Sequence, residues 1–188
     1  QLSSAGETNN IQANKKDYSQ GNLFAEFTDK DTSDSKFSNL ASLKDLVFDY
    51  QLIDTKAKRA ELIQNIKTKD FFSLDTETTN VDPIQAELVG ISFSFAENQA
   101  FYVPIPFDKE EALKIVNEFK EVLENEHTLK IGQNIKYDIL TLSNYGVQVK
   151  GPMFDTMIAH YVLQPELRHN MDYLAEIYLH YQTIPIED

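Results

Sequence analysis

Asp75 and Glu77 stand two residues apart in the run LDTETT, directly after a short apolar stretch. The segment 70–77 predicts a β-strand, because Phe71, Phe72 and Leu74 form a short apolar run with no helical period. Side chains alternate across a strand, so the two carboxylates should emerge on one face. Like charges this close are costly unless a cation compensates them or one is protonated. The pair therefore indicates a site for Mg²⁺ or Mn²⁺, with a solvated acidic loop as the alternative.

A second polar segment follows in the run LKIGQNIKYD, residues 129–138. It predicts a strand that ends at Gly132 and a helix that continues to about Tyr145. Asn134 and Asp138 are four residues apart, so they share one face of this helix. That face can look toward the acidic pair. The alternatives are a plain N-cap for Asn134 and a surface position for Asp138.

Together the two segments resemble the 3′–5′ proofreading exonuclease domain of bacterial family A DNA polymerases, the DNA polymerase I family within the DEDD exonuclease superfamily. LDTETT is similar to the first motif of that family and GQNIKYD to the second. The runs Asn144–His169 and Arg168–Leu179 are similar as well, and the resemblance extends in order from Gln51 to Asp188. Ribonuclease D-like RNA exonucleases share the two acidic motifs, but RHNMDYLAE favours the polymerase family.

The resemblance implies a two-metal exonuclease in which Asp75, Glu77 and Asp138 are both catalytic residues and metal ligands. Asp75 would bridge two divalent ions, Mg²⁺ or Mn²⁺. Glu77 would hold the first ion and orient the attacking water, and Asp138 would serve the second ion largely through water. Two such ions can activate water, bind the scissile phosphate and assist the leaving 3′ oxygen. The expected reaction is hydrolysis of the 3′-terminal phosphodiester of single-stranded DNA, releasing nucleoside monophosphates.

The resemblance also implies a set of substrate contacts. These are Thr78, Val81, Gln133, Asn134, Tyr137 and Arg168. Val81 would lie against the terminal base, and Arg168 would face the phosphate backbone, to which a guanidinium is well suited. Ordinary alternatives remain open: Val81 and Tyr137 could be core residues, and Arg168 could pair with Glu166 or Asp172.

The third motif of the family, a tyrosine and an aspartate four residues apart on a late helix, is missing. No tyrosine from Ser73 onward is followed by aspartate four residues later. The pair Tyr50 and Asp54 precedes the first motif in a strand-like run, where four residues span about 13 Å. We therefore expect a C-terminally truncated fragment of a longer polymerase, which binds metal weakly and is nearly inactive alone.

The charge composition of the chain restricts which nucleic acids it can bind. The net charge of −13 opposes binding of duplex DNA, since nonspecific affinity comes largely from cationic contacts to phosphates. The partners that the resemblance implies are a single-stranded DNA 3′ end and the polymerase and 5′-nuclease parts of the same parent chain. There is no cysteine and no apolar run of membrane length, so we expect an intracellular protein with no membrane partner. The resemblance implies a bacterial, cytoplasmic, nucleoid-associated protein.

The order of elements predicts an α/β protein. Residues 1–42 are polar and indicate a flexible linker, and residues 43–188 are expected to form the exonuclease domain, incomplete at its C-terminus. The predicted elements before the second motif are a strand over 47–53, a helix over 56–66, a hairpin over 87–95 and 100–103, and a helix over 108–123.

Asp155 follows Pro152 and is expected to cap a further helix, with support of the site as the alternative. The resemblance implies the ribonuclease H-like exonuclease fold, a mixed β-sheet flanked by helices with the acids at one edge. Two other functions remain open: a non-catalytic structural domain of a family A polymerase, and a ribonuclease D-like RNA exonuclease.

Overall fold

The structure is a computed structural model that describes residues 40–184. Within these residues one mixed sheet contains six strands in the order β1-β4-β3-β2-β5-β6. The strands are β1 (Asp49–Leu52), β2 (Phe71–Thr78), β3 (Leu88–Ser94), β4 (Gln99–Pro104), β5 (Leu129–Gly132) and β6 (Met153–Asp155). The helices are η1 (Leu43–Asp45), α1 (Lys56–Lys67), α2 (Lys109–Glu118), α3 (Lys120–Leu123), α4 (Ile135–Ser143), α5 (Thr156–Leu163), α6 (Met171–Leu174) and η2 (Ala175–Leu179).

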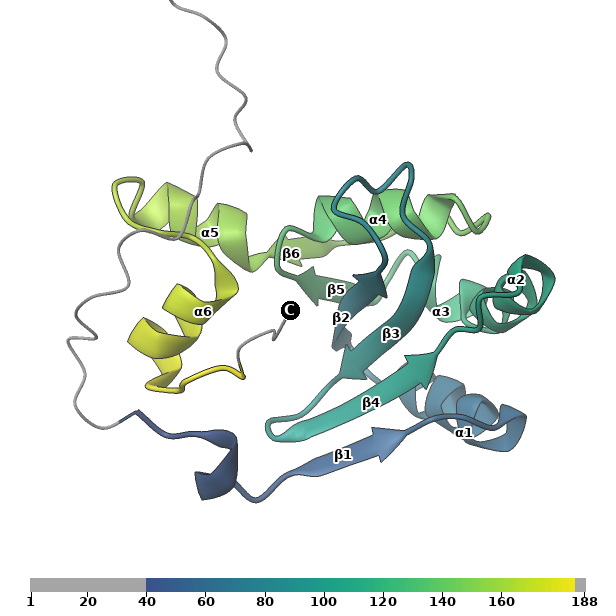
Figure 1. The fold of residues 1–188 in the computed structure, drawn as a ribbon, viewed down its shortest axis with the longest axis horizontal. Helices are drawn as coiled ribbons and strands as arrows, with labels where there is room; N and C mark the ends of the chain where they lie inside the picture. The colour runs from purple at the N-terminus through teal and green to yellow at the C-terminus, as the bar shows by residue number, and fades with distance from the viewer. Residues whose placement is uncertain (1–39, 185–188) are drawn as a thin grey trace, which may run out of the picture. The chain divides into compact units, whose positions relative to one another are not determined.

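The sheet combines an antiparallel centre with parallel flanks (Figure 1). β2 pairs antiparallel with β3. β3 pairs antiparallel with β4, and these two strands form the hairpin predicted over 87–95 and 100–103. β1 joins β4 in parallel, and β5 joins β2 in parallel, with β6 parallel beyond it. β2 is therefore an inner strand with neighbours on both sides. An inner strand fixes the side chains that it carries better than an edge strand does.

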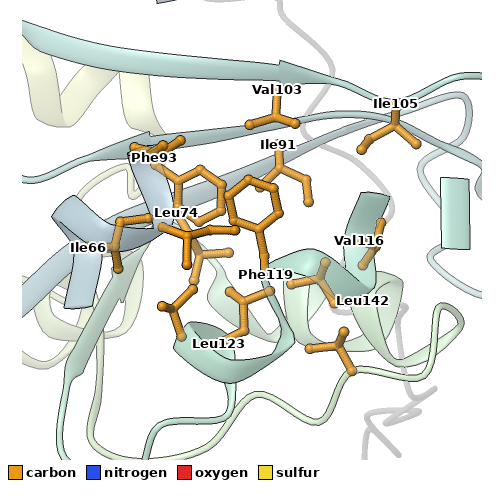
Figure 2. Close-up of a cluster of buried hydrophobic side chains, with 14 of the residues drawn as sticks. Ile66, Leu74, Ile91, Phe93, Val103, Ile105, Val116, Phe119, Leu123 and Leu142 are labelled. Carbon is orange, nitrogen blue, oxygen red and sulfur yellow. The ribbon is translucent and has the colours of Figure 1, made fainter. Parts of the chain in front are cut away.

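The hydrophobic core lies between one face of this sheet and helices α1 to α4. Figure 2 shows its centre, where side chains from the sheet meet those from the helices. Phe93 of β3 stacks on Phe119 with ring centroids 5.1 Å apart, and Phe72 of β2 lies 5.9 Å from Phe93. In β2, Phe72, Leu74 and Thr76 are buried. Strand alternation then places Asp75 and Glu77 on the opposite face, as predicted.

The helix predicted over 108–123 is wrong as a single element. α2 ends before Phe119, whose carbonyl accepts the backbone N–H groups of Val122 and Leu123, and α3 begins there as a separate turn. The Phe119 side chain is fully buried. Tertiary packing of this ring therefore overrides a continuous helical pattern in the sequence.

The linker predicted over residues 1–42 lies outside the described residues except for its last three. Among these, Ala41 pairs with Tyr181. The Ala41 N–H donates to the His180 carbonyl at 2.8 Å, and the Ala41 carbonyl accepts from the Gln182 N–H at 2.8 Å. The domain boundary after residue 42 stays a prediction.

Each helix within residues 40–184 is too short or too polar to span a lipid bilayer.

Candidate active site

Strand β2 presents the first two acids beside β3. Asp75 is paired with Ser92 and Glu77 with Gly90, and the register shifts immediately after Glu77. Such an irregularity ends regular pairing and turns the chain away from the sheet. Asp75 is half-buried and Glu77 is exposed. The two carboxylates therefore share a face at the end of an inner strand.

Helix α4 brings the third acid to the same strand. Asp138 is only 2% exposed, which excludes a surface position for it. Its Oδ1 accepts a hydrogen bond from the Thr76 backbone N–H at 2.8 Å and from the Thr76 Oγ1 hydroxyl at 2.6 Å. Thr76 is the residue between the two acids of β2, so these bonds tie Asp138 directly to the acidic pair.

A fourth carboxylate, that of Asp155, binds the backbone at the start of α4. Asn134 precedes the helix in the left-handed conformation, with φ of 56°, and its own side chain makes no capping bond. The carboxylate of Asp155 instead accepts the backbone N–H groups of Asn134 at 3.1 Å and Ile135 at 3.0 Å. It also accepts two N–H groups at the start of α5. Asp155 thus caps α5, as predicted, and supports the start of α4 as well.

Burial and neighbouring carboxylates raise the pKa of two of the acids, Asp75 and Asp138. Burial, with the charges of Asp138 and Glu77 adding to it, raises the pKa of Asp75 to about 7. Burial also raises the pKa of Asp138 to about 6, although its hydrogen bonds from Thr76 act in the opposite direction; the charge of Asp155 adds to the rise. Carboxylates that resist ionisation for lack of a counter-charge are groups that a cation would stabilise.

The arrangement fits a metal in part. The donor set is made of hard carboxylate oxygens, which suits Mg²⁺ or Mn²⁺. Over residues 40–184, however, no three His, Cys, Asp or Glu side chains are grouped closely enough to hold an ion as they stand. Asp138 also directs one oxygen at Thr76. The acids therefore form an incomplete ligand set.

Three of the predicted substrate residues gather in and beside the loop that follows β2. The hydroxyls of Thr78 and Tyr137 lie 2.5 Å apart, and each lies within hydrogen-bond distance of the carbonyl of Asn80. Val81, next in the chain, is 92% exposed, so it is not a core residue. The loop is fastened to α4 through Tyr137 and presents an apolar side chain to solvent.

Gln133 directly follows β5, and it contacts the residue after Arg168. The Gln133 amide Nε2 donates to the His169 carbonyl at 2.6 Å, and its Oε1 accepts from the Thr156 hydroxyl. Arg168, next to His169, is exposed. The structure thus ties Gln133 to the segment that carries Arg168.

A cavity of about 630 Å³ opens on the face of the sheet that carries Asp75. Its walls come from β2, β3, β5 and β6 on one side and from α5, α6 and η2 on the other. Most of the lining is apolar; Asp75, Gln133 and His160 are among its polar residues. The acid on β2 therefore borders an open hollow rather than a flat surface.

Sequence reasoning missed Thr76 and Tyr102. A side chain on Gly90 would overlap the ring and hydroxyl of Tyr102, so the tyrosine lies against the glycine that is paired with Glu77. Burial and the charge of Glu77 raise the pKa of Tyr102. A glycine inside an apolar strand signals close approach of another group. That signal, Gly90 in ELVGISF, was available in the sequence.

Comparison with known proteins agrees with this geometry. A family model described as 3'-5' exonuclease matches residues 50–187. The chain belongs to the 3'-5' exonuclease family. DNA polymerase I of Borreliella burgdorferi is 38% identical over 142 residues, covering 74% of this chain and 16% of that protein. DNA polymerase I of Pseudomonas aeruginosa is 36% identical over 152 residues, with the same two shares, 74% and 16%. The exonuclease chain thus spans about a sixth of these relatives.

The fold of this exonuclease domain is shared with a solved nuclease. Brucella melitensis NrnC with bound Mg²⁺ superposes with a TM-score of 0.59 at 18% identity, covering 76% of this chain and 66% of that one. The likeness confirms the ribonuclease H-like exonuclease fold, a mixed six-stranded sheet flanked by helices.

Proposed function

We propose that this exonuclease domain hydrolyses the 3′-terminal phosphodiester of single-stranded DNA and releases nucleoside monophosphates. One observation carries the proposal: Asp75 is half-buried beside Asp138 and Glu77, and its pKa is raised to about 7. Such a cluster is unfavourable for the metal-free fold, and perturbed carboxylates of this kind are typical of catalytic sites. The similarity to DNA polymerase I at 36–38% identity supports DNA as the substrate.

Asp75, Glu77 and Asp138 are the residues that would hold two divalent ions, Mg²⁺ or Mn²⁺. When bound, the ions supply an activated water and positive charge for the scissile phosphate. The charges of Asp138 and Glu77 both act on Asp75, so Asp75 is the acid best suited to contact both ions. Thr76 holds one oxygen of Asp138, which leaves Asp138 best placed to act through water. Glu77, the most exposed of the three, is accessible to orient the attacking water.

The loop after β2 and the start of α4 would receive the DNA strand. Val81, exposed beside Thr78 and Tyr137, offers an apolar contact for the terminal base, and stacking of this kind tolerates every base. Gln133 and Asn134 would line the path of the strand, and Arg168 would face its phosphates. A proofreading activity needs this tolerance, since it must accept any terminal nucleotide.

The rest of the parent protein would hold the duplex. The net charge of −13 disfavours duplex binding by this part alone, and the relatives are about six times as long as the matched region. We therefore assign polymerase and 5′-nuclease parts to the same parent chain. The parent protein would act in the bacterial cytoplasm, associated with the nucleoid.

The proposal is tested by following a 5′-labelled single-stranded DNA with Mg²⁺ or Mn²⁺. The present chain should degrade it slowly. A longer chain that continues as the DNA polymerase I relatives do should degrade it from the 3′ end at a far higher rate. Asp75→Ala should remove the activity of both, and an RNA strand of the same sequence should be a poorer substrate. A longer wild-type chain that is inert with both metals would instead establish a structural domain, and preference for RNA would establish a ribonuclease D-like enzyme.

A further inference from the structure

The end of α5 and the segment that follows it contain one partly buried residue among exposed ones. Every residue from Tyr161 to Arg168 is exposed, and so is Asn170; His169 alone among them is partly buried. Arg168, the proposed phosphate contact, directly precedes His169. The anchoring of His169 therefore restricts where the backbone of Arg168 can lie.

Two bonds fix His169. Its backbone carbonyl accepts the Gln133 amide at 2.6 Å. Its imidazole Nδ1 lies 2.7 Å from the Nδ1 of His160, a residue of α5 that is only 3% exposed. The first bond leads to the end of β5 and the second to the interior side of α5. Together they attach the Arg168 segment to the frame that carries the acids.

The two imidazoles must take opposite hydrogen-bonding roles at Nδ1. A contact between two Nδ1 atoms requires that one carries a hydrogen and the other a lone pair, so the rings must differ in protonation at Nδ1. Ring contacts hold them in place: His169 packs against Tyr161, with centroids 5.0 Å apart, and His160 packs against Tyr178 at 5.7 Å. The Nε2 of His160 has no hydrogen-bond partner within residues 40–184. The Nδ1 contact is therefore the polar interaction that orients His160.

We propose that His160 and His169 are positioning residues that hold Arg168 in the path of the DNA backbone. The inference rests on the proposed function, because it takes Arg168 as a phosphate contact. Neither histidine touches the reacting atoms. Both act through Arg168, so their removal should weaken binding of single-stranded DNA and matter little once Arg168 itself is gone.

A double-mutant cycle on the chain of residues 1–188 tests this coupling. His169→Phe keeps a ring against Tyr161 and removes Nδ1, and Arg168→Ala removes the guanidinium. Affinity for a fluorescein-labelled oligothymidylate is measured by anisotropy in Ca²⁺. We expect Arg168→Ala to weaken binding about tenfold, His169→Phe about threefold to fivefold, and the double variant no more than Arg168→Ala alone. His127→Phe, at an exposed histidine distant in sequence, serves as the control and should leave affinity unchanged.

The proposal would be overturned if His169→Phe lowered the affinity equally in the presence and absence of Arg168. Unchanged affinity in either single variant would overturn it as well. These outcomes are separate from failure of the proposed function, which is lack of metal-dependent hydrolysis sensitive to Asp75→Ala. ¹⁵N NMR of the wild-type imidazoles gives a readout independent of folding of the variants. It should find one of the two rings protonated at Nδ1 and the other not; two rings both protonated only at Nε2 would exclude the contact.

Discussion

Helices α4 and α5 each follow a strand of the same sheet and are of similar length, nine and eight residues. α5, with the sequence TMIAHYVL, is the more apolar of the two. Yet α4 buries four side chains, including Asp138 and Thr141, whereas α5 buries only His160. Apolar residues at the surface of α5, such as Val162 and Leu163, are about three-quarters exposed.

The difference follows from topology rather than from composition. α4 connects β5 to β6 and passes over the face that holds the core, so its inward residues meet β2. α5 follows the edge strand β6 and lies beside the cavity on the other face. Asp138 is thus fixed from a well-packed interior. The residues proposed to guide the DNA backbone depend on a small number of polar contacts.

The largest contrast in unfolding free energy should come from removing one aromatic ring in the core and one on the edge strand β6. Phe93 is 1% exposed and Phe154 of β6 is 48% exposed. We expect Phe93→Ala to lower the free energy of unfolding by about 3–5 kcal/mol, because it empties space against Phe72 and Phe119. Phe154→Ala should lower it by less than about 1 kcal/mol. Chemical denaturation followed by circular dichroism measures both; equal losses would contradict the comparison.

A smaller effect should appear as a dependence of the unfolding free energy on pH, caused by Asp75. The pKa of Asp75 is about 7 when folded, against an ordinary value of 3.8. Between these values the folded chain keeps a proton that the unfolded chain has lost. The free energy of unfolding of the metal-free chain therefore falls as pH rises through that window.

Asp75→Asn cannot ionise, so it should exceed the wild type in unfolding free energy at about pH 8, by on the order of 2 kcal/mol. The two chains should converge below about pH 4. Denaturation curves across this range give the result, with the exposed Asp70→Asn as the control. Parallel curves for wild type and Asp75→Asn would show that the acid is not held in an unfavourable environment.

Two buried threonines allow a matched test of how the core supports Asp138. Thr76 donates its hydroxyl to Asp138 at 2.6 Å, whereas the Thr141 hydroxyl has no partner within the described part of the chain. Thr76→Val should lower the free energy of unfolding by about 1–2 kcal/mol and weaken Mn²⁺ binding about tenfold. Thr141→Val should be neutral or stabilising, by up to about 1 kcal/mol. Titration calorimetry with Mn²⁺ and denaturation separate the two, and similar losses in both would refute a specific role for Thr76.

The smallest effect is expected on the outer face of α5. Val162 is 74% exposed, so Val162→Ser should change the free energy of unfolding by less than about 0.5 kcal/mol. A thermal melt measures it. A loss as large as that of Thr76→Val would mean that this face is packed in solution.

Much of the secondary structure was predictable because it depends on local periodicity. The strand with Asp75 and the helix with Asp138 lie where the apolar patterns put them, to within two residues at most termini. β6 was not predicted, since three residues carry too little pattern to distinguish a strand from a loop. Its pairing with β5 is a long-range property of the sheet.

The site was predictable only in part for the same reason. Alternation along β2 placed Asp75 and Glu77 on one face, and the motif resemblance added Asp138. The depth of Asp138, its bonds from Thr76 and the bonds of Asp155 to the start of α4 all depend on contacts between residues 20 or more positions apart. No local rule gives such contacts from one sequence. The roles of the residues proposed to contact metal and DNA stay predictions.

The contact between Gly90 and Tyr102 limits how this sequence can diverge. The space that a side chain at Gly90 would need is taken by the ring of Tyr102, and the same ring lies near Glu77. Neither position can therefore change freely on its own. Related chains with a larger residue at the first position should carry a smaller one at the second, and such paired replacement would leave Glu77 in a different electrostatic setting. These two positions lie twelve residues apart on neighbouring strands. Their covariation would thus report on the electrostatic environment of a third residue, Glu77.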